Sequence, residues 1–316
     1  MTYDPAMRTG ASAAMKIGEL GFSYEVFPPR SVDAERQLTG TVAALSAYGP
    51  TDISVTYGAG GADRDRSLAT VARLKRLTGR TPTAHLTCAG QTKDDVEETL
   101  NGLVAQGVTR IVALRGDAPL EGTPVAPGVG YADARALVAA LAKRSNLEIV
   151  VAAYPEGHPK AASPAACLDA LVAKFDAGAD AAITQFCYDN AAFFRLRDAL
   201  AARGIDKPLI PGILPLHDIE QVKRFARRCG ARVPAWLLEA GRRVANDSEL
   251  AHLFALSFLI DQVRDLAAGG VTDCHFYSLN RANLVQPALE ILRRDNSVNL
   301  RTGSRTVIPS AHRFMA

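Results

Sequence analysis

Hydrophobic and polar positions divide the chain into two alternating kinds of segment. Eight short segments are rich in β-branched and aromatic residues, and nearly every one ends in a polar or glycine-containing stretch. They are residues 22–28, 52–58, 83–88, 110–117, 149–155, 181–189, 208–216 and 273–280. Between them, as in residues 191–203 and 221–229, apolar residues recur at helical spacing. Strands that alternate with helices predict right-handed βαβ units and a parallel sheet.

Eight such units predict a single-domain α/β fold, the (β/α)8 TIM barrel, over residues 21–294. Residues 1–20 are expected to form an N-terminal arm with a short helix over residues 11–20. A last helix over residues 282–294 is expected before a polar C-terminal tail, residues 295–316. Residues 118–130 contain too much Pro and Gly for a helix and are expected to form a functional loop.

The composition indicates a soluble cytoplasmic protein. The net charge of +3 gives no argument for a nucleic-acid or anionic membrane partner. No apolar run approaches the roughly 20 residues that a membrane-spanning helix needs. The 5 cysteines show no CxxC spacing, which is typical of reduced structural thiols in the cytoplasm.

Glu25 is the first candidate catalytic residue. It interrupts an apolar strand, and period-two alternation places its carboxylate on the same face as Ser23 and Phe27. A carboxylate inside a barrel is costly to ionise, so its pKa is expected to rise toward neutrality. A general acid that works near pH 7 requires this, although a buried ion pair with an arginine is the alternative.

Polar residues at the ends of the second and fourth predicted strands are candidates for ligand binding. Gly116 permits a ligand to approach the backbone closely, and Arg115 offers a forked donor for phosphate or carboxylate. Asp117 follows them, and an Arg–Asp turn is the structural alternative. Thr56 opens a glycine-rich loop, which alone is weak support for a phosphate or planar ligand.

Residues of the fifth and sixth strands suggest a site for a ring and a pyrophosphate. Tyr154 and His158 follow strand five, and Lys174 lies on the next helix, so together they offer an aromatic face and cationic donors. Gln185 is an amide inside an apolar barrel, and either protein groups or a bound heterocycle would satisfy its hydrogen bonds. Arg281, after the last strand, either clamps a ligand carboxylate or begins the final helix.

His85 lies two residues before Thr87 on the third strand and is compatible with either a core position or a site. His85 and Cys88 suggest a metal, but no third ligand is spaced to complete such a site. No metal site is therefore predicted.

Nine strings of the chain, taken in order, resemble the methylenetetrahydrofolate reductase family. They are FSYEVFPPR, SVTYGAGG, AHLTC, IVALRGD, AAYPEGHPKA, DAGADAAITQFCYD, PGILPL, PAW and HFYSLNR. The resemblance covers roughly residues 20–294 and all eight predicted strands.

This resemblance implies reduction of 5,10-methylenetetrahydrofolate to 5-methyltetrahydrofolate by NADH or NADPH. The hydride would pass through FAD in a ping-pong cycle, and the reverse direction in the cell is left open. Glu25 would be the acid that opens the five-membered folate ring. Asp117 would stabilise the cationic folate and tune the flavin. The family also implies a homo-oligomer, either a dimer or a tetramer.

The same matching assigns binding residues along the chain. The FAD contacts would be Thr56, Tyr57, Ala59, His85, Arg115, Gly116, Asp117, Tyr131, Ala132, Tyr154, His158 and Lys174. The folate contacts would be Gln185, Gln221 and Arg281, with Phe225 packing against either substrate.

The chain departs from the family pattern on the helix after AAYPEGHPKA. Cys167, Ala170 and Ala173 stand where polar groups for the adenosine end of FAD are expected, and Asp169 would replace the missing aspartate only with a change of register. The resemblance therefore implies weaker FAD binding. Two other functions stay open, a flavin-free folate-dependent enzyme such as a methyltransferase and a non-catalytic folate- or flavin-binding barrel.

Overall fold

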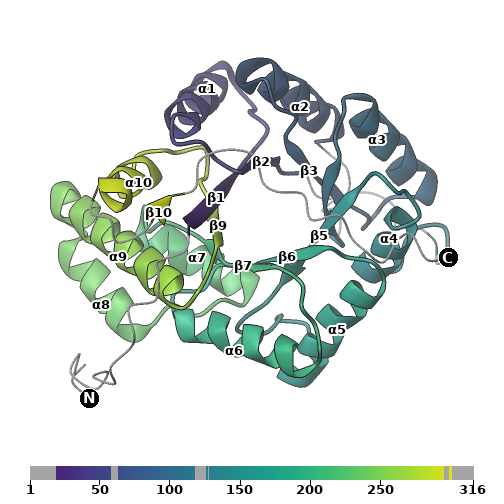
Figure 1. The fold of residues 1–316 in the computed structure, drawn as a ribbon. Helices are drawn as coiled ribbons and strands as arrows, with labels where there is room; N and C mark the ends of the chain where they lie inside the picture. Colours follow the sequence, from purple (N-terminus) through teal and green to yellow (C-terminus); the bar gives the residue numbers. More distant parts are fainter. Residues whose placement is uncertain (1–18, 58–62, 118–125, 127, 295–298, 301–316) are drawn as a thin grey trace.

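The computed structural model describes residues 19–57, 63–117, 126, 128–294 and 299–300. Helices form a ring around a central set of strands, so the chain is a barrel with an outer helical layer (Figure 1). No helix of this described part is both long enough and apolar enough to cross a membrane.

The strands of the barrel are all parallel to their neighbours. They are β1 (Glu19–Val26), β2 (Asp52–Val55), β3 (Thr83–Thr87), β4 (Arg110–Leu114), β5 (Glu148–Ala153), β6 (Ala181–Thr184), β7 (Leu209–Ile210), β8 (Gly212–Ile213) and β9 (Asp273–Tyr277). Strands β1 to β7 pair in chain order, and β9 pairs with both β1 and β8. Because β7 and β8 are halves of one extended segment, the ring closes, and the predicted TIM barrel is confirmed.

The seventh barrel position is divided at Pro211. Proline has no backbone N–H to donate, so it interrupts the ladder between the strands on either side. Its carbonyl still accepts a hydrogen bond from the His275 amide at 2.9 Å. The predicted strand over residues 208–216 is therefore two strands of two residues each.

The helices connect the strands and cover the barrel from outside (Figure 1). They are α1 (Val32–Ser46), α2 (Arg64–Thr78), α3 (Lys93–Ala105), α4 (Ala134–Leu141), α5 (Pro164–Asp176), α6 (Asn190–Ala202), α7 (Ile219–Cys229), α8 (Ala235–Val244), α9 (Ser248–Ala268) and α10 (Val285–Arg294). Side-chain caps fix several starts, as where Asp218 accepts a hydrogen bond from the Gln221 amide and begins α7. Three helices, α7 to α9, separate β8 from β9.

Alternation along β1 separates the outer core from the barrel interior. Phe22, Tyr24 and Val26 are fully buried members of the hydrophobic core. Ser23 and Glu25 lie on the opposite face, which points into the barrel. The period-two argument for Glu25 is therefore confirmed.

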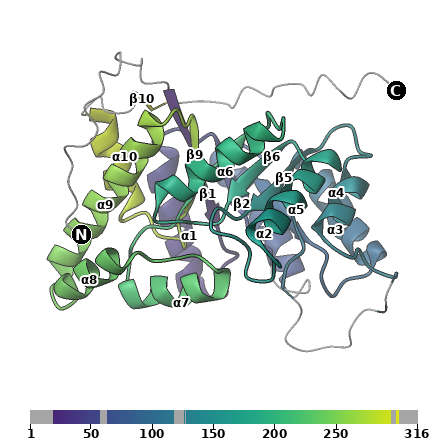
Figure 2. The same ribbon diagram turned by 90° about the horizontal axis from the view of Figure 1, so that it is seen from below.

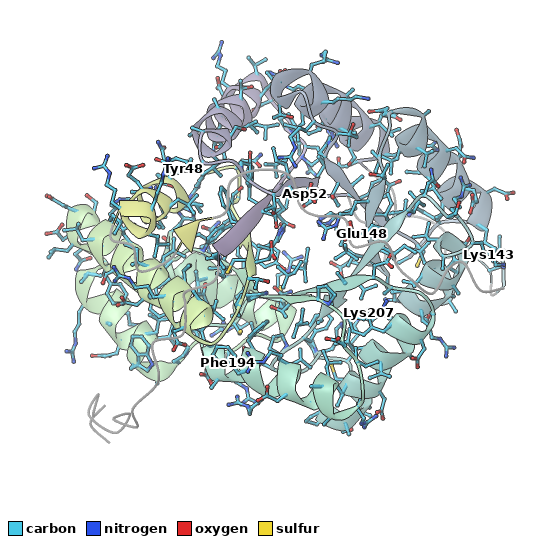
Figure 3. The ribbon with its side chains drawn as sticks, viewed as in Figure 1. Tyr48, Asp52, Lys143, Glu148, Phe194 and Lys207 are labelled. Atoms are coloured by element: carbon cyan, nitrogen blue, oxygen red, sulfur yellow. The ribbon has the colours of Figure 1, made fainter. Side chains whose placement is uncertain are left out.

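An ionic network lies at the amino ends of the strands. The Arg110 guanidinium contacts the Asp52 carboxylate at 2.6 Å and the Glu148 carboxylate at 3.1 Å, joining β4 to β2 and β5. Asp52 and Glu148 both lie inside the ring of helices in Figure 3. This network is at the opposite end of the strands from the predicted site.

The predicted N-terminal arm ends earlier than expected. Glu19 and Leu20 belong to β1, where they pair with β10 (Asn299–Leu300), so these two residues are not helical as predicted. The rest of the predicted helix, residues 11–18, lies outside the described residues. So does most of the predicted loop over residues 118–130.

Candidate active site

The candidate site lies at the carboxyl ends of the strands. Figure 2 shows α7 on this side of the barrel and β10 at the opposite end. Glu25 is the residue before the last in β1, paired with Ser54 of β2 and Tyr277 of β9. Its side chain therefore points into the barrel interior near the carboxyl ends of the strands.

Glu25 is buried, with 8% of its surface exposed, and burial raises its pKa to about 8. The arginine partner that the alternative hypothesis requires is not found for it among the described residues. The Nε2 atom of His85 lies 3.8 Å from Glu25 Oε2. At pH 7 the Glu25 carboxyl is thus mostly protonated, as a general acid must be.

His85 is held beside Glu25 as a neutral ring. Its Nε2 lies 3.3 Å from Ser54 Oγ on β2. Burial lowers the pKa of His85 to about 4, so it carries no charge at neutral pH. The pair of Glu25 and His85 is therefore a contact between two neutral groups and not a salt bridge.

Sequence reasoning did not single out two residues of β9 that complete the barrel interior. Tyr277 donates from its hydroxyl to the Thr184 carbonyl at 2.6 Å, which links β9 to β6 across the barrel. The His275 ring contacts Ser23 through Nδ1 and Oγ at 2.8 Å. Period-two alternation in residues 273–277 was the available signal, because it places both rings on the face of Glu25.

Gly212 makes room for the Tyr277 ring. A Cβ at this position would lie 2.5 Å from the ring and 2.1 Å from the Thr184 carbonyl oxygen. The Gly212 amide donates to Thr184 Oγ1 at 2.9 Å, so the backbone is fixed close to β6. No larger residue fits without moving the aromatic ring.

The end of β9 is strained and tightly hydrogen-bonded. Leu279 and Asn280 both adopt left-handed backbone conformations, with φ of 51° and 54°. Asn280 Oδ1 accepts from the Phe27 amide at 2.8 Å, and its Nδ2 donates to the Phe27 carbonyl at 3.0 Å. These hydrogen bonds join the ends of β1 and β9. Arg281, the residue after Asn280, is exposed.

The residues assigned to a ring and a pyrophosphate gather around the ends of β4 and β5. The rings of Tyr154 and His158 meet edge to face, with centroids 4.6 Å apart. Lys174 Nζ donates to the Ala152 carbonyl at 2.5 Å, and burial lowers its pKa to about 8. Arg115 and Asp117 are exposed at the end of β4.

Gly116 holds the end of β4 close to β3. Its φ is 79°, and a Cβ there would lie 2.7 Å from the Thr87 Cβ. Glycine is therefore required here both by the left-handed backbone and by the lack of space beside Thr87.

Two of the predicted flavin contacts lie toward α3 instead. The Tyr57 hydroxyl is 3.3 Å from both Gln91 Oε1 and Thr99 Oγ1. Lys93 lies over the Tyr131 ring at 5.9 Å from its centroid.

The remaining predicted flavin contacts are Thr56, Ala132 and Ala59. Thr56 is half-buried at the end of β2, and Ala132 is exposed after Tyr131. Ala59 lies outside the described residues.

The predicted folate contacts come from β6, α7 and the end of β9. Gln185 follows β6, and its Oε1 accepts from the Phe186 amide at 3.0 Å. Gln221 and Phe225 are half-buried one helical turn apart on α7. Gln185, Tyr154 and Cys229 line one small cavity, so the end of α7 reaches the residues that follow β5 and β6.

The residues at which the chain departs from the family pattern lie along α5. Cys167 and Ala173 are half-buried, and Ala170 is exposed. The Asp169 carboxylate pairs with Arg203 at the end of α6 at 2.9 Å. Among the α5 positions that the resemblance matches to FAD contacts, Lys174 is the one with a charged side chain.

A closed parallel (β/α)8 barrel with a buried, protonated carboxyl group at the carboxyl ends of its strands defines a barrel enzyme. The model of one family, described as methylenetetrahydrofolate reductase, matches residues 11–294. The chain therefore belongs to the methylenetetrahydrofolate reductase family and is an oxidoreductase.

Curated relatives support this assignment over most of their length. The chain is 41% identical over 273 residues to the 5,10-methylenetetrahydrofolate reductase of Pectobacterium carotovorum, covering 86% of this chain and 90% of that protein. It is 40% identical over 275 residues to the enzyme of the same name from Escherichia coli, with the same coverage.

A solved structure shares the fold. An uncharacterized protein from Clostridium thermocellum, which binds two copies of 5-methyl-5,6,7,8-tetrahydrofolic acid, has a TM-score of 0.58 and 16% sequence identity. The similarity covers 89% of this chain and 96% of that chain. At this identity the similarity concerns the barrel itself.

Proposed function

We propose that the protein reduces 5,10-methylenetetrahydrofolate to 5-methyltetrahydrofolate with NADH or NADPH. The observation that carries this proposal is the position of the Glu25 carboxyl, which is buried inside the barrel at the carboxyl ends of the strands, where burial raises its pKa to about 8. The names of the curated relatives support the same reaction.

Glu25 is proposed to open the five-membered ring of the folate. Its protonated carboxyl donates to the ring nitrogen that leaves the bridging carbon, and this makes that carbon an acceptor for hydride. His85 is neutral and does not draw the proton from Glu25. The proton thus remains on Glu25 until the substrate takes it.

Asp117 is proposed to stabilise the positive charge that develops on the folate. Its carboxylate is exposed at the end of β4, on the same face of the barrel as Glu25. A fixed negative charge beside a developing cation lowers the barrier electrostatically.

Several residues fit FAD as the cofactor. The Tyr154 and His158 rings would contact the ring system, and Arg115 and Lys174 would bind the pyrophosphate. Gly116 would let the end of β4 stay packed against β3 beside the cofactor. When bound, the flavin supplies hydride transfer between the nicotinamide and the folate. The weakly polar face of α5 supplies few hydrogen bonds to the adenosine end, so we propose weaker binding there.

Gln185, Gln221 and Arg281 are proposed to hold the folate. The two amides suit the donor and acceptor edge of a pterin, and the exposed guanidinium suits the carboxylates of the glutamate tail. Phe225 lies one turn from Gln221 and would pack against the bound substrate.

We also propose a cytoplasmic homo-oligomer. Trp236 of α8 and Leu250 and Leu253 of α9 are each more than half exposed, which supports a contact between copies of the chain. Light scattering of the purified protein across a dilution series tests this assembly.

A visible absorption spectrum of the purified protein tests the reaction. After addition of FAD if needed, the flavin band should bleach with NADH or NADPH under anaerobic conditions and return with 5,10-methylenetetrahydrofolate. A protein that binds no flavin would favour a flavin-free folate enzyme, and one that binds without turnover would favour a non-catalytic binding protein.

A further inference from the structure

Two segments of the barrel mouth meet at Glu156. The residue lies in the loop between β5 and α5, and its Oε2 accepts a hydrogen bond from the Arg232 backbone amide at 2.7 Å. Arg232 lies three residues beyond the end of α7. A side-chain acceptor on one segment therefore binds the backbone of the other.

A second contact lies beside this hydrogen bond. Gly230 caps α7 with a φ of 73°, and a Cβ there would lie 2.5 Å from the Pro159 ring. The loop and the end of α7 are thus packed without space for a side chain between them. The hydrogen bond and this packing together hold the end of α7 against the loop.

The two segments carry different parts of the proposed site. The loop holds Tyr154 and His158, assigned to the flavin, whereas α7 holds Gln221 and Phe225, assigned to the folate. Figure 2 shows α7 lying across the mouth side of the barrel. The position of the carboxyl end of α7 therefore affects where Gln221 and Phe225 lie relative to the strands.

The loop keeps its shape through contacts that do not involve Glu156. The Gly157 amide donates to the Tyr154 carbonyl at 3.1 Å, and the Lys160 amide donates to His158 Nδ1 at 3.0 Å. The two rings also pack on each other. Loss of the Glu156 hydrogen bond should accordingly release the end of α7 more than the loop.

We propose that Glu156 is a positioning residue for folate binding. By accepting from the Arg232 amide it fixes α7 over the mouth and holds Gln221 and Phe225 in the position that binds folate. The inference rests on the function proposed above. It assigns the residue a role through α7 and no contact with the reacting atoms.

Four single variants and one double variant test this role. Glu156→Ala removes the acceptor, and Glu156→Gln keeps an acceptor oxygen. Arg232→Pro removes the amide donor, whereas the matched control Arg232→Ala keeps that amide and removes only the side chain. The double variant Glu156→Ala/Arg232→Pro should be no worse than either single variant if both act through this one hydrogen bond.

Limited proteolysis reports the release of α7 without relying on activity. Arg227, Arg228 and Arg232 are exposed trypsin sites in this region. Glu156→Ala and Arg232→Pro should be cut faster at Arg227 and Arg228 at an unchanged melting temperature, and Glu156→Gln and Arg232→Ala should be cut as the wild type is. Equal cutting of Glu156→Ala and wild type would overturn the proposal, whatever reaction the protein catalyses.

Steady-state kinetics then test whether the position of α7 affects folate binding. Glu156→Ala and Arg232→Pro should raise the KM for 5,10-methylenetetrahydrofolate about ten- to hundredfold, with FAD affinity within about twofold of wild type. An equal loss of FAD affinity in Glu156→Ala would instead make Glu156 a support of the flavin loop and would overturn the proposal. If the wild-type protein shows no turnover, the proposed reaction is rejected. The proteolysis result then still tests whether the Glu156 hydrogen bond holds the end of α7.

Discussion

Glu25 and His85 place a neutral carboxyl group 3.8 Å from a neutral imidazole inside the barrel. Burial moves the two pKa values in opposite directions, to about 8 for Glu25 and about 4 for His85. Between these values neither group is mainly charged, so the acid keeps its proton beside a potential base. The burial of both groups therefore favours the protonation state that the proposed acid role of Glu25 requires.

Glu25→Gln should abolish folate reduction while the transfer of hydride from nicotinamide to flavin continues. An amide has no proton to donate, and loss of a general acid costs about 10²- to 10⁴-fold. In the wild type, folate reduction should decline as the pH rises through about 8, because the carboxyl then ionises. Stopped-flow measurement of the two half-reactions separates these effects, and unimpaired folate turnover in the variant would reject the acid role.

Asp117→Asn should slow the folate half-reaction about ten- to hundredfold and affect nicotinamide oxidation less. The substitution keeps the size of the side chain and removes the charge that faces the developing cation. The same stopped-flow assay measures both rates. Equal losses in the two half-reactions would argue against a selective electrostatic role.

Stability should be greatest near neutral pH and decline on both sides. Burial lowers the pKa of His85 and His217 to about 4 and of His275 to about 3. The unfolded chain takes up protons on these rings near pH 6.5, so the folded state loses stability as the pH falls from that value toward 4.

For Glu25 the sign of the pH dependence is opposite. Its folded pKa is raised from 4.5 to about 8, so the unfolded chain ionises first and stability declines as pH rises across that range. Urea unfolding midpoints from pH 4.5 to 8 measure both effects. Glu25→Gln should flatten the decline between pH 6.5 and 8, and His275→Gln should reduce the loss below pH 6.5. Unchanged profiles would contradict these assignments.

Asn280→Ala should destabilise the protein by about 2–4 kcal/mol. The change removes two hydrogen bonds to the Phe27 backbone and places a Cβ-bearing residue without a local acceptor at a φ of 54°. Asn280→Gly loses the same hydrogen bonds but relaxes the backbone, so it should cost about 1 kcal/mol less. Denaturant titration compares the two, and equal costs would show that backbone strain contributes nothing.

Arg110→Met should destabilise the protein by about 3–5 kcal/mol, because it leaves the Asp52 and Glu148 carboxylates without their shared cation. The double variant Arg110→Met/Asp52→Asn should recover part of this loss, since one of the two charges is then removed. FAD affinity should be nearly unchanged because the network lies at the amino ends of the strands. A large loss of affinity at full stability would contradict that separation.

The sequence predicts the barrel and the position of Glu25 well because both follow from local alternation. It predicts strand ends less well: residues 110–117 and 181–189 were expected as strands, but β4 ends at Leu114 and β6 at Thr184. The residues that were expected in these strands but lie beyond their ends include Asp117 and Gln185. The ladder that pairs neighbouring strands has ended at these positions. Contacts between distant segments, such as Tyr277 with Thr184 or Glu156 with Arg232, have no local pattern to predict them.

The division of the seventh strand at Pro211 has a consequence for how the barrel assembles. Strands β1 to β6 each pair with the next strand along the chain, so they can associate as they leave the ribosome. The ring closes only after β9 has been made, because β9 joins β1 to β8. Two strands of only two residues each therefore form the seam, and amide hydrogen exchange should begin at Ile210 and Ile213 before it reaches β3 or β4.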